Sequence, residues 1–150
     1  MALKETITEF INHPVIAVAG VSRNRRKFGS IIYHHMLKHG YTVYPINPNI
    51  KEYEGAPCYA DVTSLPEDAQ VVVTVTPPDA TLQIVHDAAN RGITMIWMQP
   101  GSTSKEAVAL AESHGIKVVN AKCIMMFAEP VKSIHRLHRS INKLFGQYPG

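Results

Sequence analysis

The stretch that decides the fold is Val15 to Tyr41, VIAVAGVSRNRRKFGSIIYHHMLKHGY. It opens with a continuous apolar run that ends at Gly20, a pattern typical of a strand buried on both faces of a sheet. From about Lys27 to His39 apolar side chains recur at helical spacing, and Gly40 follows as a stop signal. A strand, a loop that begins with glycine and a helix form the first half of a βαβ unit.

The rest of the chain continues this alternation. Apolar patterns predict further strands at residues 42–46, 70–75, 94–98 and 116–120, and helices at 78–91, about 103–113 and about 128–145. Pro78 suits the first position of its helix, and Thr103 to Glu106 fits a capping box. Short connections between strands and helices predict an α/β fold in which helices cover both faces of a parallel sheet of about five strands. Ligands of such sheets bind at the carboxyl ends of the strands.

Length and composition place the chain among globular proteins. Its 150 residues suit a single domain, and 45% of them are hydrophobic and 18% charged. No run approaches the roughly 18 apolar residues of a membrane helix, and MALKETITEF lacks the features of a signal peptide. We therefore expect a cytoplasmic protein with no membrane partner. Cys58 and Cys123 lie far apart without a CxxC motif, which excludes a disulfide framework and a zinc knuckle.

The loop after the first strand is strongly basic. It holds Arg23, Arg25, Arg26 and Lys27, and no Asp or Glu occurs between Phe10 and Lys51. This distribution indicates either an anionic partner or a solvated basic surface. A nucleotide phosphate at the start of the following helix would gain from free backbone N–H groups and from the helix dipole.

This loop departs from the common phosphate-binding motifs. No glycine occurs between Gly20 and Gly29, so neither GxGxxG nor the P-loop pattern is present. The second strand ends at Asn47, where NAD-binding folds commonly place a carboxylate that accepts hydrogen bonds from the ribose. A neutral Asn with Lys51 nearby tolerates a ribose that carries its own phosphate. The residues therefore favour NADP or coenzyme A (CoA) over NAD and do not separate these two.

Six segments carry a resemblance to a known family. They are AVAGVS…KFG, GYTVYPINPN, YEGAPCYADVTSLP, VVVTVTPP, IWMQPGSTSKEA and GIKVVNAKC, and they cover about residues 11–123. In order and spacing they resemble the small stand-alone CoA-binding proteins, a family similar to the N-terminal CoA-binding domain of the succinyl-CoA synthetase alpha subunit. The resemblance implies a Rossmann-like, doubly wound fold that holds CoA or an acyl-CoA. From this fold, together with the chain length and the amphipathic helix predicted at the C-terminus, we expect a single domain over residues 1–150.

The resemblance also implies positions for the parts of CoA. The diphosphate would lie against Gly20, Val21, Ser22, Arg26 and Lys27, and Phe28 next to them would also contact the ligand. The adenosine and its 3′-phosphate would lie near Asn47, Pro48 and Lys51. The adenine or the pantetheine arm would pass over Thr74, Thr76 and Pro77, and the thiol end would meet Trp97, Gln99 and Gly101.

Cys123 and Trp97 have alternative interpretations. The Cys123 thiol, at the same edge of the sheet, could form a mixed disulfide with CoA, or Cys123 is a small buried residue. Trp97 suits core packing as well as the site.

No catalytic constellation is recognisable in the sequence. GxSxG, HExxH and paired carboxylates are missing, so we expect ligand binding without catalysis. The competing hypothesis is an NADP-dependent oxidoreductase or another nucleotide-binding protein, although the strand-end loops offer no evident Tyr–Lys pair or catalytic His. The histidine pairs at 35 and 39 and at 135 and 138 lack a nearby third ligand, so no metal is expected.

The last predicted helix has a basic face. It carries Lys132, Arg136, Arg139 and Lys143. This face is either a solvated surface or a binding surface. Its partner would be another protein, a second copy of the chain in a homodimer or, as the alternative that we rank last, nucleic acid.

Overall fold

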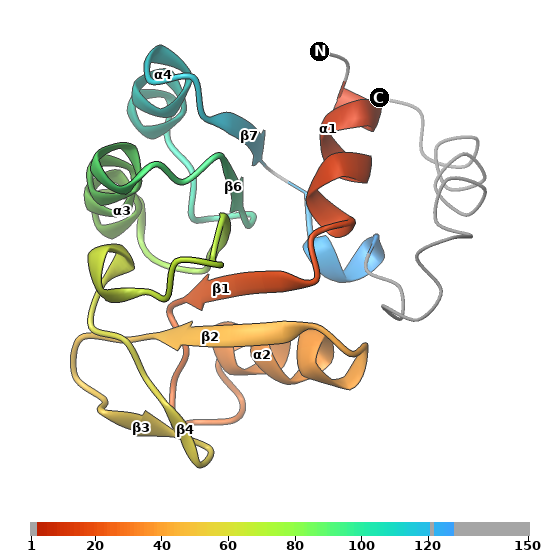
Figure 1. Ribbon diagram of the computed structural model, residues 1–150, viewed down its shortest axis with the longest axis vertical. Helices are drawn as coiled ribbons and strands as arrows, with labels where there is room; N and C mark the ends of the chain where they lie inside the picture. Colours follow the sequence, from red (N-terminus) through yellow and green to blue (C-terminus); the bar gives the residue numbers. More distant parts are fainter. Residues whose placement is uncertain (1–2, 121, 128–150) are drawn as a thin grey trace.

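The computed structural model describes residues 3–120 and 122–127, and these are organised around a five-stranded sheet (Figure 1). The strands are β1 (Val15–Ala19), β2 (Thr42–Ile46), β5 (Val71–Thr74), β6 (Met95–Met98) and β7 (Lys117–Asn120). Their order is β2-β1-β5-β6-β7, and every neighbouring pair is parallel. The chain thus adds β2 on one side of β1 and later β5 on the other. In an open α/β sheet, a crevice forms at such a reversal of strand order.

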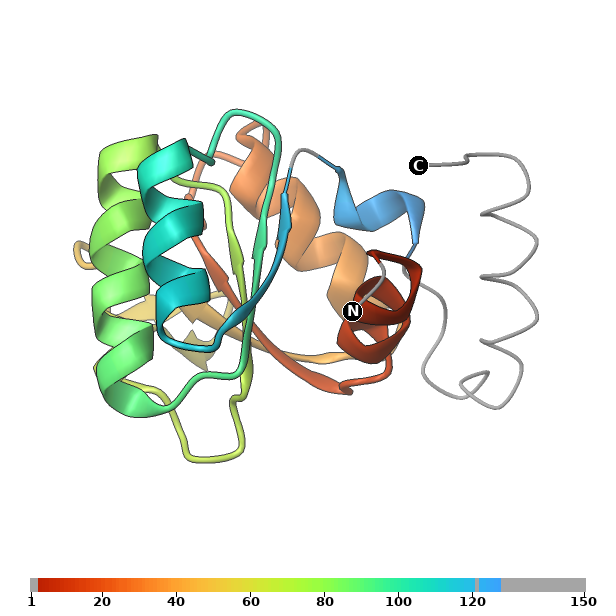
Figure 2. The ribbon, with the colours of Figure 1, turned by 90° about the horizontal axis from the view of Figure 1, so that it is seen from above.

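Helices cover both faces of this sheet (Figure 2). On one face lie α3 (Pro78–Arg91) and α4 (Lys105–Ser113); on the other lie α1 (Leu3–Ile11), α2 (Phe28–Lys38) and the short η2 (Ile124–Met126). The predicted doubly wound α/β fold is therefore confirmed. The helix predicted at 128–145, with its histidines and basic face, lies outside the described residues. None of the helices in the described part of the chain has the length and apolar character of a membrane span.

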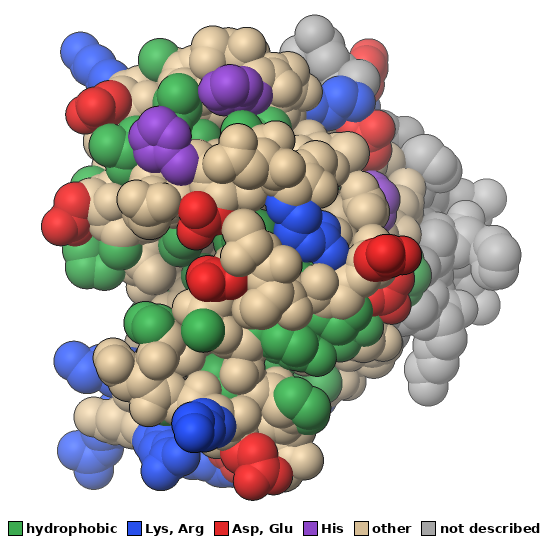
Figure 3. Space-filling model, turned by 60° about the vertical axis from the view of Figure 1, so that its left-hand side comes forward, with side chains coloured by type: hydrophobic (Ala, Val, Ile, Leu, Met, Phe, Trp, Pro, Cys, Tyr) green, Lys and Arg blue, Asp and Glu red, His purple; other side chains and the backbone are tan. Residues whose placement is uncertain are grey.

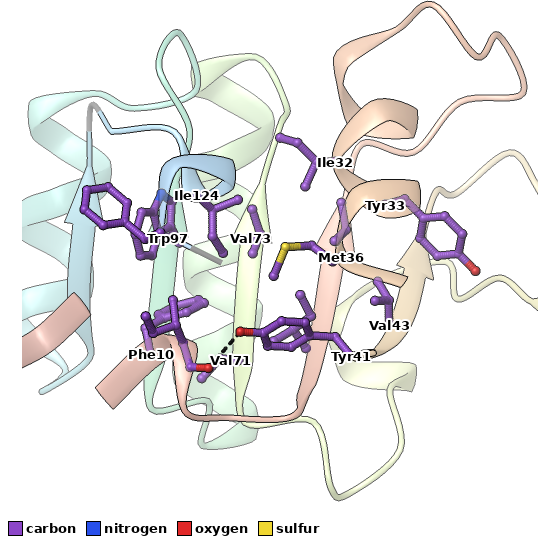
Figure 4. Close-up of a cluster of buried hydrophobic side chains, with 14 of the residues drawn as sticks. Phe10, Ile32, Tyr33, Met36, Tyr41, Val43, Val71, Val73, Trp97 and Ile124 are labelled. Atoms are coloured by element: carbon purple, nitrogen blue, oxygen red, sulfur yellow. Dashed lines mark hydrogen bonds between the residues drawn. The ribbon is translucent and has the colours of Figure 1, made fainter. Parts of the chain in front are cut away.

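The two layers of the core differ in the size of their side chains. Alternate strand residues face opposite sides, so Val18 joins the layer beneath α1 and α2, and Ala17 joins the layer beneath α3 and α4. The first layer is built from large side chains, many of which are labelled in Figure 4. There Phe10 meets Trp97 edge to face with ring centroids 5.2 Å apart. The second layer uses many alanines, which let α3 and α4 approach the sheet closely.

The helix ends follow the predicted signals with one exception. Pro78 begins α3, and Gly92 ends it with a φ of +84°. The predicted capping box at Thr103 is wrong by one residue, because Ser104 has the extended backbone of an N-cap and its Oγ accepts a hydrogen bond from the Ala107 N–H at 3.1 Å.

A small hairpin separates β2 from β5. Its strands, β3 (Glu52–Tyr53) and β4 (Ala56–Pro57), pair antiparallel across a two-residue turn, and the short helix η1 (Val62–Ser64) follows. Glu54 and Gly55 both have positive φ, 53° and 78°, as a type I′ turn requires. The hairpin lies at the lower left of Figure 1, on the side of the molecule toward which β1 and β2 point.

Candidate functional site

A cleft of about 560 Å³ opens at the carboxyl ends of β1, β2 and β5, where the strand order reverses. Its walls are the end of β1, the loop after β2, residues 60–61 and one face of α3. The lining residues are Ala19, Gly20, Ile46, Asn47, Pro48, Asn49, Ala60, Asp61, Thr76, Ala80, Gln83, Ile84 and Asp87. Figure 3 looks onto this side of the molecule and shows Lys and Arg side chains gathered at its lower end.

Two glycines let α2 begin directly against the end of β1. Gly20 has a φ of +104°, and a Cβ there would lie 2.7 Å from the Val75 carbonyl oxygen. A Cβ on Gly29 would lie 2.0 Å from the Gly20 carbonyl oxygen. Both positions therefore require glycine. Together they provide the tight turn and the close helix–strand packing that the GxGxxG motif provides in dinucleotide-binding folds.

The loop between these glycines leaves the start of α2 open. Lys27 is the N-cap residue and makes no side-chain capping hydrogen bond. Arg26 and Lys27 are exposed and form no ion pair with any described residue. The loop holds its shape by local bonds, because Ser22 Oγ accepts from the Asn24 N–H at 3.1 Å and Asn24 Oδ1 from the Arg26 N–H at 3.0 Å. The start of α2 therefore combines uncapped first-turn N–H groups with two exposed cations, an arrangement that suits an anion.

Arg25 differs from its basic neighbours because it has a partner. Its guanidinium donates to Glu54 Oε1 at 2.7 Å, and His34 Nε2 lies 3.0 Å from the same oxygen. The hydrogen bond from Arg25 holds the pKa of Glu54 below its usual value, with a smaller contribution from His34. This carboxylate therefore stays ionised and links the loop to the β3–β4 hairpin.

Asn47 ties together the two loops that border the cleft. Its Nδ2 donates to the Val21 carbonyl at 2.8 Å, and its Oδ1 accepts from the Asn49 N–H at 2.8 Å. An aspartate could not donate to Val21, so the amide has a structural reason to be there as well as the electrostatic one inferred from the sequence.

Two carboxylates that are not among the predicted binding residues, Asp61 and Asp87, also line the cleft. Asp61 lies at the cleft because Tyr59, two residues earlier, forms a parallel bridge with Ile46 at the end of β2. The Thr63 hydroxyl, followed by the Ser64 N–H, lowers the pKa of Asp61 by hydrogen bonding to it. Asp87 comes from α3, on the helix face that also carries Ala80, Gln83 and Ile84. These four share a 3–4 residue spacing, so helical periodicity could have found them, whereas nothing local in the sequence marks Asp61.

Apart from the thiol end, the expected binding residues fall into three groups. Gly20, Asn47, Pro48 and Thr76 line the cleft. The second group lies in the loop after β1 and at the start of α2: Val21 is buried, Ser22 is half-buried, and Arg26, Lys27 and Phe28 are exposed. Lys51, beyond β2, and Pro77, beyond β5, are also exposed. Thr74 faces inward instead, because its Oγ1 lies 2.7 Å from Ser102 Oγ in a hydroxyl network that continues to Thr81 and Thr76.

The expected thiol end is divided between the core and the sheet edge. Trp97 is fully buried, and its Nε1 donates to the Lys122 carbonyl at 2.7 Å, so the structure supports core packing for this residue. Gln99 is also fully buried at the end of β6, and its Oε1 accepts from the Ile124 N–H at 2.8 Å. That bond brings Gln99 beside half-buried Cys123, the residue before Ile124, while Gly101 is exposed.

Sequence and structure comparisons agree with this architecture. A family model described as CoA binding domain matches residues 14–129. The chain belongs to the CoA-binding domain family. A conserved hypothetical protein from Pyrococcus furiosus is 41% identical, with a TM-score of 0.71 over 73% of this chain and 95% of that one. A hypothetical protein from Pyrococcus horikoshii OT3 is 29% identical, with a TM-score of 0.79 over 94% of this chain and 93% of that one. The predicted resemblance to small stand-alone CoA-binding proteins is confirmed.

Larger proteins contain a segment similar to this chain. Acetate–CoA ligase [ADP-forming] I from Archaeoglobus fulgidus is 28% identical over 122 residues, which make up 75% of this chain and 18% of the ligase. The chain spans between 17% and 20% of the length of four curated relatives that it matches.

Proposed function

We propose that this chain binds CoA or an acyl-CoA non-covalently in the cleft and carries out no catalysis of its own. The observation that carries the proposal is the open start of α2, flanked by Arg26 and Lys27, next to a cleft with apolar walls. The first feature suits phosphates, and the second suits a base or another flat group. CoA combines a diphosphate and a 3′-phosphate with an adenosine.

The charges of the site suggest how the ligand is oriented. Asp61 and Asp87 line the cleft and would repel phosphates, whereas their oxygens can accept hydrogen bonds from amino and hydroxyl groups. We therefore place the adenosine in the cleft and the diphosphate at the first turn of α2. The 3′-phosphate would lie toward Lys51, and the pantetheine arm would run past Thr76 toward the edge where Gln99 and Cys123 lie.

Binding without catalysis is proposed for these 150 residues because they correspond to only a small part of the ligases they resemble. The matched segment is 18% of the acetate–CoA ligase of Archaeoglobus fulgidus. We propose that chemistry on an acyl group requires parts of such proteins beyond the CoA-binding domain. We also propose that residues 1–150 form one domain.

Calorimetric titration with CoA, dephospho-CoA, NAD and NADP tests the proposal. We expect the affinity for CoA to be highest, and that for dephospho-CoA to be lower because one charge-assisted phosphate contact is lost. Preference for NAD, or equal affinity for CoA and dephospho-CoA, would contradict it. Tighter binding of NADP than of CoA, together with hydride transfer from NADPH to a carbonyl substrate, would favour the oxidoreductase hypothesis.

A further inference from the structure

One buried hydroxyl connects the β3–β4 hairpin to the loop that follows β1. Tyr53 is 3% exposed, and its hydroxyl donates to the Ser22 carbonyl at 2.9 Å. The same oxygen lies 2.7 Å from Ser30 Oγ in the first turn of α2. Since a phenol has one proton and Ser22 accepts it, Ser30 is the donor in the second bond. A single side chain thus fixes both the loop and the start of the helix.

Further contacts of Tyr53 and Glu54 hold the hairpin in this place. The Tyr53 ring packs edge to face on Tyr33 of α2, with centroids 4.9 Å apart. Glu54, at the turn, binds Arg25 of the loop and His34 of α2. It is also the single non-glycine residue with positive φ in the described part of the chain. A backbone conformation that is uncommon for Glu persists where surrounding contacts fix it.

The bond from Tyr53 determines where the next amide points. In a trans peptide the C=O and the following N–H point in opposite directions. Tyr53 draws the Ser22 carbonyl toward the hairpin, so the Arg23 N–H points away from it. Asn47 does the same one residue earlier, since it draws the Val21 carbonyl and turns the Ser22 N–H the other way. Neither of these two N–H groups has a hydrogen-bond partner among the described residues.

We propose that Tyr53 is a positioning residue of the phosphate site. It keeps the Ser22 carbonyl oxygen, which would repel an anion, turned into the hairpin, and it leaves the Arg23 amide free to donate to a ligand phosphate. The inference rests on the proposed CoA site and adds to it a part of the chain that lies outside the cleft wall.

The test compares two Tyr→Phe variants that remove the same kind of bond. Tyr53→Phe keeps the ring against Tyr33 and loses the hydroxyl. Tyr41→Phe is the matched control, because Tyr41 is also 3% exposed and its hydroxyl also donates to a backbone carbonyl. That carbonyl belongs to Ile11 at the end of α1 and lies 2.8 Å from the hydroxyl (Figure 4). We expect Tyr53→Phe alone to weaken CoA binding, by about five- to tenfold.

Adenosine separates positioning from a general loss of structure. It lacks phosphates and would occupy the cleft alone, so its affinity, followed by NMR titration, should be the same in Tyr53→Phe and the wild type. Unchanged CoA affinity in Tyr53→Phe would overturn the proposal. Equal losses for CoA and adenosine would also overturn it.

Hydrogen exchange in the free protein tests the same contact without a ligand. Amides of residues 22–30 should exchange faster in Tyr53→Phe than in the wild type, and Tyr41→Phe should leave them unchanged. Unaltered exchange in Tyr53→Phe would show that the hairpin does not hold the loop, and would overturn the inference. A wild type that fails to bind CoA would instead contradict the proposed function, while the exchange experiment still decides the role of Tyr53.

Discussion

The strictest constraint on a single residue falls on Gly29. Replacing a helical Gly with Ala ordinarily raises the free energy of unfolding by roughly 0.5–1 kcal/mol. At position 29 the new Cβ would lie 2.0 Å from the Gly20 carbonyl oxygen, so α2 would have to move away from β1. We expect Gly29→Ala to lower the free energy of unfolding, measured in urea, by about 1–3 kcal/mol. A more stable variant would show that α2 does not begin against the end of β1.

The basic side chains of the loop should contribute unequally to binding. Lys27 is the N-cap of α2 and has no ion pair among the described residues, whereas Arg23 lines a hollow with Glu52 and Glu54, which offset its charge. We expect Lys27→Ala to weaken CoA binding about fivefold or more and Arg23→Ala about twofold or less, in calorimetric titrations at one salt concentration. Equal losses in the two variants would mean that only the diffuse charge of the loop matters.

Among the elements, α2 carries a group that makes stability depend on pH. His35 is half-buried and stacks on His39 with ring centroids 4.2 Å apart. Burial, with smaller effects of His39 and Lys38, lowers the pKa of His35. The unfolded chain therefore binds this proton more readily, and the free energy of unfolding should fall as the pH drops from about 6.5 through the lower folded pKa.

Substitution of His35 tests that dependence. In urea denaturation, His35→Asn should lose less stability than the wild type between about pH 7 and pH 5. His86→Asn, at an exposed position on α3, is the control and should behave as the wild type does. An identical pH dependence in His35→Asn and the wild type would contradict the lowered pKa.

Elements with a long apolar pattern were predictable, and the shortest ones were not. β1, β2 and α3 match their predicted ranges from end to end, and α2 agrees within one residue at each end. α1 is absent from the predicted elements, although the helical spacing of Leu3, Ile7, Phe10 and Ile11 indicates it. The β3–β4 hairpin gives no such signal, because two residues per strand are too few for a period. Its place depends on bonds from Tyr53 and Glu54 to a loop distant in sequence.

At the scale of the whole molecule, topology predicts where the site lies but not all of its members. Alternating strands and helices place ligands at the carboxyl ends of the strands, which is why Gly20, Asn47 and Thr76 were found from the sequence. Asp61 could not be found that way, because the Ile46–Tyr59 bridge that brings it beside Asn47 exists only in three dimensions. The basic loop beside the cleft is therefore predictable from the sequence, whereas the Asp61 carboxylate reaches the largely apolar wall of the cleft only through the fold.

The two layers of the core separate the cleft from the only tryptophan of the chain. Ala19 and Ile46 of the cleft belong to the layer beneath α3 and α4, whereas Trp97 packs with Phe10 in the opposite layer. We therefore expect Trp97 fluorescence to shift to the red on unfolding in urea and to stay unchanged when CoA saturates the protein. Phe10→Ala should lower the free energy of unfolding by about 3–5 kcal/mol and leave CoA affinity unaltered. A strong change of Trp97 emission on addition of CoA would instead place the indole at the thiol end, as the family resemblance implies, and would contradict its assignment to the core.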